Sequence, residues 1–332
     1  MAFEKVFAIT NRDVVYPGDP EGNRGWNSAP VAYYRDRLRK KGMKFSMYLS
    51  SLNPSDINRR VARGEQKCVA MCYTSGHSKV NNIKIKTDGG LMHDCCDGGD
   101  FVDFSKAYKN FSVKMKPFRN KRVFFVNSCN YAHHYSALFS RWAFENHGKA
   151  GNPSVILNID QHCDCSGGKS VNNSSWGNWL FHYHPQRYSP YGAFLALGTE
   201  DYDRKKSWAI RSGAKVTTRG LNDGQVKAQL QQAVQNKKIT ECDLYISLDR
   251  DVFTHAITSF KPGKKTWKYV RESIVEPVLG ALPGYRIVGS DITGLPSGRR
   301  MEADRKRRTT NKIMDETIED IVRFHGLITM SS

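Results

Sequence analysis

This sequence of 332 residues lacks several features that mark common classes of protein. No stretch approaches the roughly 18 consecutive apolar residues of a membrane-spanning helix. The N-terminal segment MAFEKVFAITNRD has no apolar core of the kind found in signal peptides. We therefore predict a cytoplasmic protein with no membrane partner. Internal repeats, low-complexity tracts and evident linkers are also missing, which favours one domain over residues 1–332.

Acidic residues are scarce relative to basic ones. The chain has 32 Asp and Glu against 51 Lys and Arg, which gives a formal net charge of +19. Such a field attracts polyanions, including nucleic acid and acidic peptides. The basic residues are scattered, however, and no RNP, zinc-finger or helix-turn-helix signature accompanies them. Nucleic acid is therefore the less favoured partner, an acidic leader peptide is the alternative, and a homo-oligomer is left open.

The eight cysteines come without a secretion signal, so we interpret them as reduced thiols rather than a disulfide framework. Cys68, Cys72, Cys95 and Cys96 lie near His93 and leave a structural zinc site open. Their spacing matches no familiar zinc module. The chemistry of the chain has to be sought in its other polar residues.

Strand-like and helix-like segments alternate from about residue 120 onward. Alternation of this kind predicts the α/β class, with a mainly parallel sheet covered by helices on both faces. Residues 1–115 are less regular, and we interpret them as the lead-in to the same domain, whose core is 116–332. A separate N-terminal module is the alternative. We expect strands at 122–127, 154–159, 192–198, 243–248 and 286–290, and helices at 135–149, 224–238, 266–282 and 315–328.

Polar residues gather directly after the expected strands. In LNIDQHCDCS, Asp160, His162 and Asp164 occupy every second position after an apolar run. If the extended conformation continues past the strand, these three side chains point the same way. Buried carboxylates next to an imidazole are costly unless a cation neutralises them, and a divalent metal does so. The pattern taken alone is equally compatible with a polar loop after a core strand.

A second acidic pair makes coincidence less plausible. In SLDRDVF, Asp249 and Asp251 again alternate at the end of an apolar strand, and YAHHYSAL adds a histidine just before a helix. His134 is preferred there over His133. Mainly oxygen ligands with a minority of imidazole suit Mn²⁺. Because four negative charges balance two dications, we expect two Mn²⁺ ions per chain and a water ionised for hydrolysis. The expected metal ligands are His134, Asp160, His162, Asp164, Asp249 and Asp251.

These ordered motifs resemble the binuclear manganese site of the arginase, agmatinase and deacetylase superfamily. The resemblance implies a three-layer α/β/α fold, two Mn²⁺ ions and attack of a bridging hydroxide on a guanidinium carbon, which releases urea. It also implies that His134 and Asp164 belong to one metal and His162 to the other. The remaining aspartates would complete and bridge the pair.

The segments NYAHHYSALFSRW, NIDQHCDC and SSWGNWLFHYHP are similar to a peptide arginase-like family, whose members convert arginine residues of ribosomally made peptides to ornithine. Small-molecule arginases usually have Gly-Gly-Asp-His where this chain has YAHH. They also have a guanidinium-pairing Glu near the last strand, and SDITGLPSG has Gly294 at that place. The resemblance therefore implies a peptidyl arginine substrate rather than free arginine.

The catalytic roles are expected at His162, Asp164 and Asp291. Asp291 ends an expected strand, and it is either a carboxylate that contacts or supports the site or an ordinary capping residue. Two alternatives to the peptide enzyme stay open. The chain is either a small-molecule ureohydrolase or deacetylase of the same superfamily, or a catalytically inactive basic binding protein.

Overall fold

The structure is a computed structural model, and it places thirteen segments of the chain. It describes residues 5–10, 37–43, 45–49, 68–69, 82–83, 91–93, 101–127, 134–162, 193–198, 223–236, 240–256, 263–295 and 310–331.

A parallel sheet of seven strands forms the centre of the structure, in the order β2-β1-β7-β11-β10-β8-β9. The α/β class and the mainly parallel sheet are thus confirmed. Two short antiparallel pairs, β3 with β4 and β5 with β6, lie outside it. The strands are β1 (Lys5–Thr10), β2 (Phe45–Leu49), β3 (Cys68–Val69), β4 (Asn82–Ile83), β5 (Leu91–His93), β6 (Phe101–Asp103), β7 (Val123–Asn127), β8 (Ser154–Ile159), β9 (Ala193–Leu197), β10 (Cys242–Asp249) and β11 (Tyr285–Thr293).

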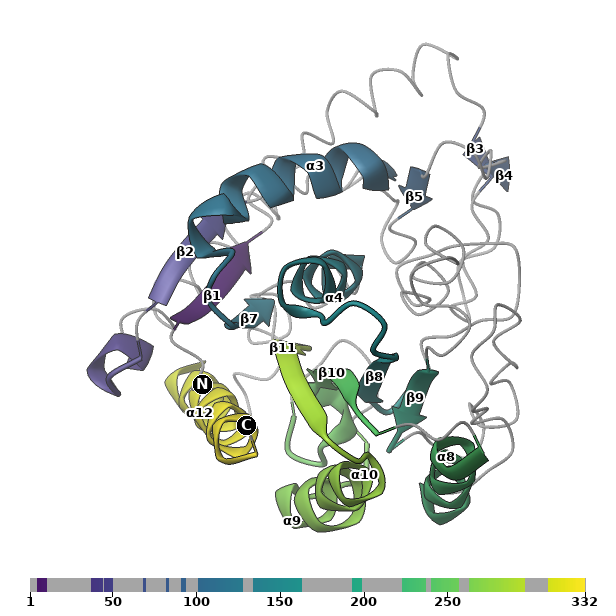
Figure 1. The fold of residues 1–332 in the computed structure, drawn as a ribbon. Helices are drawn as coiled ribbons and strands as arrows, with labels where there is room; N and C mark the ends of the chain where they lie inside the picture. Colours follow the sequence, from purple (N-terminus) through teal and green to yellow (C-terminus); the bar gives the residue numbers. More distant parts are fainter. Residues whose placement is uncertain are drawn as a thin grey trace.

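Helices cover both faces of this sheet, as Figure 1 shows, which gives three layers. One face carries α3 and α4, and the other carries α8, α9, α10 and α12. None of the helices in the described part of the chain is long and apolar enough to cross a membrane. The helices are α3 (Phe104–Met115), η1 (Lys116–Phe118), α4 (His134–His147), α8 (Asp223–Asn236), η3 (Arg250–Val252), α9 (Trp267–Tyr269), η4 (Val270–Val275), α10 (Glu276–Ala281) and α12 (Thr310–Met330).

The central strands are buried on both faces, which explains their nearly continuous apolar sequences. In β10, Leu244, Ile246 and Leu248 belong to the core shared with α8, α10 and α12. Tyr245 points the opposite way, and its ring lies 6.3 Å from that of Phe144 in α4. Alternation along the strand therefore sends every second side chain toward α4.

Aromatic packing fixes α3 and α4 on their face. Phe125 of β7 stacks on Phe139 of α4 with ring centroids 4.2 Å apart, and Phe111 of α3 lies 5.6 Å from Phe139. Trp142 of α4 packs edge-on against Phe125 at 6.1 Å. These rings position the N-terminal end of α4 near the carboxyl ends of the central strands.

The expected helix over 266–282 is observed as three consecutive segments. Its middle part, η4, is a π-helix in which the N–H of Glu276 donates to the carbonyl of Arg271. Pro277 follows directly, and it has no N–H with which to continue the α-helical ladder. The local change of hydrogen-bond spacing next to a proline is the difference from the regular helix that the sequence predicts.

α4 packs closely against the sheet at Gly289 of β11. A Cβ atom there would lie 2.8 Å from the Cβ of Ala143 and 3.1 Å from the ring of Tyr245. We expect Gly289→Ala to lower the free energy of unfolding by about 1–3 kcal/mol, because overpacking forces α4 away from the strand. Urea-induced unfolding measures this change.

Gly280→Ala is the matched control. Gly280 is exposed in α10, and a Cβ atom there meets nothing within 4 Å. Alanine should therefore stabilise the protein by about 0.4–1 kcal/mol, through the entropy of the unfolded chain. A stable Gly289→Ala protein would contradict the described packing of α4.

Candidate metal centre

The loops after β8 and β10 bring three of the expected ligands together. β8 and β10 are adjacent parallel strands, so their carboxyl ends meet at one edge of the sheet. One ligand atom from each of Asp160, His162 and Asp251 lies within 4.8 Å of the other two. Two carboxylates and an imidazole at this spacing could hold a metal ion.

The route by which they converge differs from the one expected. β8 ends at Ile159, and residues 160–162 bend instead of continuing the strand. The N–H of His162 donates to Oδ1 of Asp160 at 2.7 Å, which is the side chain to backbone contact of an Asx turn. The prediction of an extended Asp-x-His alternation was wrong, because the chain bends at residues 160–162 and the carboxylate of Asp160 accepts from the backbone N–H of His162. The turn nevertheless brings His162 beside Asp160.

Both carboxylates are anchored by donors while they face the imidazole. Nδ1 of His162 lies 2.8 Å from Oδ2 of Asp251 and 3.5 Å from Oδ1 of Asp160. The N–H of Gln161 donates to the other oxygen of Asp251 at 3.2 Å. Asn158 donates from its side chain to Oδ2 of Asp160 at 3.4 Å. These bonds fix the orientation of the two carboxylates before any ligand binds.

Asp249 supports the same loop from the end of β10. Its backbone is still extended, and its Oδ1 accepts a 2.9 Å hydrogen bond from the N–H of Asp251. Asp249 therefore caps the short helix η3 on which Asp251 lies. It is buried next to the cluster of Asp160, His162 and Asp251.

The electrostatics of the cluster favour a cation. Burial and the negative charges of Asp249 and Asp160 raise the pKa of Asp251 well above its ordinary value, against the influence of His162. Burial alone would lower the pKa of His162, but the carboxylates of Asp251 and Asp160 outweigh it and raise that pKa. Like charges are thus held close together in a buried place, where a divalent ion would relieve their repulsion. The residues present fit a metal ion.

The remaining expected site residues are placed as follows. His134 is the first residue of α4, at the helix start where a ligand was expected. His133 and Asp164 lie outside the described residues, as do Cys72, Cys95 and Cys96 of the zinc alternative.

Asp291 is fully buried on the α4 face of β11. In register it pairs with Ser247, two residues before the level of Asp249. Burial and the nearby carboxylate of Asp291 raise the pKa of Tyr245 well above its ordinary value. Asp291 thus lies deeper in the sheet than the cluster of Asp160, His162 and Asp251.

Residues 249–251, which include Asp249 and Asp251, form the metal loop. Gly294 packs directly against Asp249 of this loop. Its φ is +73°, and a Cβ atom there would lie 2.1 Å from Oδ1 of Asp249. It would also lie 2.9 Å from the backbone nitrogen of Arg250. A side chain at this position would displace Asp249, so this packing requires a glycine.

Comparison with solved structures relates this fold to that of arginase. Arginase from Bacillus caldovelox matches with a TM-score of 0.50 at 11% sequence identity, over 98% of this chain and 98% of that one. Arginase from Bacillus subtilis gives 0.48 at 12% identity over 97% of both chains. Formiminoglutamase from Trypanosoma cruzi, whose structure was determined with Mn²⁺, gives 0.47 at 13% identity over 99% and 94%.

No protein-family model and no curated protein matches the sequence. The likeness to the Bacillus caldovelox enzyme therefore concerns the fold, which is a three-layer α/β arginase-like fold. The fold that the sequence motifs imply is thereby confirmed.

The contact between Gly294 and Asp249 gives a test of the site. We expect Gly294→Ala to weaken the binding of a divalent ion such as Mn²⁺ by about 10-fold or more, because the new Cβ atom displaces the carboxylate that caps η3. Isothermal titration calorimetry measures the affinity.

Gly284→Ala is the matched control at the other end of β11. Gly284 also has a positive φ, +53°, and a Cβ atom there would lie 2.5 Å from the carbonyl oxygen of Thr240. This variant carries similar backbone strain, so it should lose stability and keep its metal affinity. Equal loss of affinity in both variants would show that strain in β11, and not Asp249, sets the affinity.

Proposed function

We propose that the protein is a manganese-dependent hydrolase that acts on a guanidino group, most readily an arginine side chain within a peptide, and releases urea. The observation that carries this proposal is the convergence of Asp160, His162 and Asp251 at the carboxyl edge of an arginase-like sheet. Ligands at that edge are typical of parallel α/β enzymes. The product within the peptide is an ornithine residue.

Mn²⁺ suits this donor set because two of the three grouped ligands are carboxylates. What such an ion supplies when bound is Lewis acidity, which makes water a nucleophile near neutral pH. In the proposal, His134 and Asp164 complete a site for a second ion, together with Asp249. A deacetylase reaction would use the same groups. The chemistry of the site therefore supports a hydrolase in general, and other observations have to identify the substrate.

The chain's own residues hold the site in place and exclude water from its base. The backbone N–H groups of Gln161 and His162 orient the carboxylates of Asp251 and Asp160. Asp291 is fully buried, and this burial favours a role in supporting the strand ends over direct contact with substrate. His162 is partly exposed and is therefore the member of the cluster that an incoming substrate can reach.

The steric limit at Gly294 supports a peptide substrate. The resemblance implies that small-molecule arginases of the superfamily have a glutamate at this place, which pairs with the guanidinium, and here no side chain fits. Recognition would then depend on the rest of a larger substrate, where remote contacts can supply binding energy. The net charge of +19 would attract an acidic leader segment of such a peptide.

Incubation of the Mn²⁺-loaded protein with free arginine, agmatine and arginine-containing peptides tests the substrate. Urea release from a peptide, with ornithine in that peptide by mass spectrometry, is the expected result. Turnover of free arginine as fast as any peptide would favour a small-molecule ureohydrolase. Release of acetate from an acetylated amine would favour a deacetylase, and failure to bind Mn²⁺ would favour the inactive binding protein.

Asp251→Asn tests the role of the cluster in this activity. The substitution keeps the volume but removes one negative charge from the buried group. We expect urea release to fall more than about 100-fold, since even residues outside the ligand set cost about 10–100-fold in metal sites. Part of the activity should return at high Mn²⁺, because loss of one ligand weakens binding before it abolishes the chemistry.

Asp315→Asn is the control for this variant. It makes the same chemical change at an exposed residue of α12, which forms a 4.0 Å ion pair with Arg37. Activity and Mn²⁺ affinity should stay unchanged. Full activity in Asp251→Asn would contradict the proposed metal centre.

A further inference from the structure

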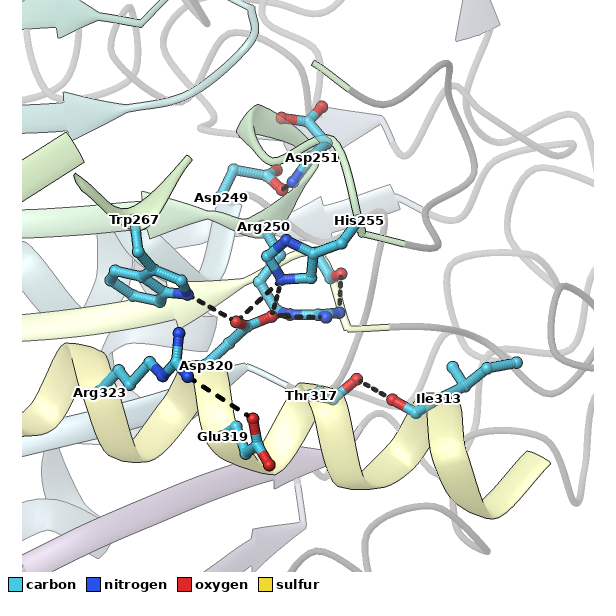
Figure 2. Close-up of polar contacts among 11 residues, drawn as sticks. Asp249, Arg250, Asp251, His255, Trp267, Ile313, Thr317, Glu319, Asp320 and Arg323 are labelled. Atoms are coloured by element: carbon cyan, nitrogen blue, oxygen red, sulfur yellow. Dashed lines mark hydrogen bonds and ion pairs between the residues drawn. The ribbon is translucent and has the colours of Figure 1, made fainter. Parts of the chain in front are cut away.

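Arg250 occupies the position between the two acidic residues of the metal loop, yet it points away from them. Its side chain is only 2% exposed and extends to α12 on the other face of the sheet, whereas Asp249 and Asp251 stay at the strand end (Figure 2). A buried guanidinium is costly unless it is paired and hydrogen-bonded. The buried position of Arg250 therefore requires a charged partner from α12.

This partner is the carboxylate of Asp320 in α12, which is also nearly fully buried. Nη2 and Nε of Arg250 lie 2.7 Å and 2.9 Å from Oδ2 of Asp320. Trp267 donates to the other oxygen at 2.8 Å, and Nε2 of His255 lies 3.0 Å from it. Burial would raise the pKa of Asp320, but the charge of Arg250 and the other hydrogen bonds outweigh it and lower that pKa. Asp320 is an ionised anchor for three side chains.

The same guanidinium also contacts the end of β11. Its Nη1 lies 3.4 Å from the carbonyl oxygen of Gly294, the residue that packs against the carboxylate of Asp249. The anchor thus joins the end of β10, the end of β11 and α12. Movement of Arg250 would move its two sequence neighbours, because η3 is only three residues long.

We propose that Asp320 is a positioning residue for the metal centre, which holds Asp249 and Asp251 in place through Arg250. This inference rests on the proposed function, because it assumes that the cluster of Asp160, His162 and Asp251 binds Mn²⁺. It assigns to the C-terminal helix a part in metal binding at a distance from the ligands. By reciprocity, metal binding must then also strengthen the docking of α12 against the sheet.

Asp320→Asn tests the inference, with Mn²⁺ affinity as the readout. The substitution leaves Arg250 buried without an ionised partner, so the loop should shift, and the affinity should fall about 10–100-fold. Glu319→Gln is the matched control on the same turn of α12. Glu319 is exposed and pairs with Arg323 at 3.8 Å, so the loss of its charge should leave the affinity unchanged.

A double variant separates positioning from stability. Arg250→Met combined with Asp320→Leu removes both charges and leaves neither partner buried alone, a change that is often neutral or stabilising. The melting temperature of the metal-free protein should therefore return close to that of the wild type, while the Mn²⁺ affinity stays at least 10-fold lower. Recovery of the affinity together with the melting temperature would overturn the inference.

Hydrogen exchange of the wild-type protein gives a second test, which does not require any variant to fold. Addition of Mn²⁺ should slow the exchange of amides in α12, because docking of the helix and binding of the metal are coupled. Unchanged exchange in α12, with Mn²⁺ bound, would overturn the inference and leave the proposed function intact. If the wild-type protein binds no Mn²⁺ at all, the proposed function fails and the inference fails with it.

Discussion

The concentration of buried negative charge at one edge of the parallel sheet is the constraint on which the rest of the site depends. Asp160, Asp249 and Asp251 are held at the ends of the adjacent strands β8 and β10, and burial makes their mutual repulsion strong. The chain meets this constraint with backbone N–H donors, which fix each carboxylate without neutralising it. His162 supplies partial compensation. The carboxyl edge of the sheet is therefore arranged to bind a cation, and the helices on both faces of the sheet shield the buried side of the site from bulk water.

The strands and helices of the core could be predicted from the sequence because their periods are clear. Leu244, Ile246 and Leu248 alternate with residues that face α4, and the whole of β10 is buried. Parallel strands also place polar residues at a common edge, so the grouping of Asp160 with Asp251 follows from the fold class. The order of the strands does not follow from such periods. It is the order β11-β10-β8 that makes the loops of Asp160 and Asp251 neighbours.

The parts that could not be predicted depend on contacts between distant residues. The alternation Asp160, His162 is compatible with a strand, but competition from the carboxylate of Asp160 for a backbone N–H turns the chain instead. Arg250 is similar, because a charged residue within a polar loop is normally exposed. Its partner Asp320 is 70 residues away and lies beside Glu319 in the same acidic stretch. Only the packing of α12 makes Asp320 buried and leaves Glu319 in solvent.

The pairing of Arg250 with Asp320 also preserves the negative charge of the metal loop. A guanidinium between two acidic residues is the nearest cation in sequence, and if it turned toward Asp249 and Asp251 it would compete with any metal ion for them. Its charge is instead compensated by Asp320 on the opposite face of the sheet. The pair as a whole is neutral, so the three carboxylates at the strand ends keep their attraction for a dication. Asp320 therefore stabilises the metal loop, and by pairing with Arg250 it leaves the negative charges of Asp249 and Asp251 available to a metal ion.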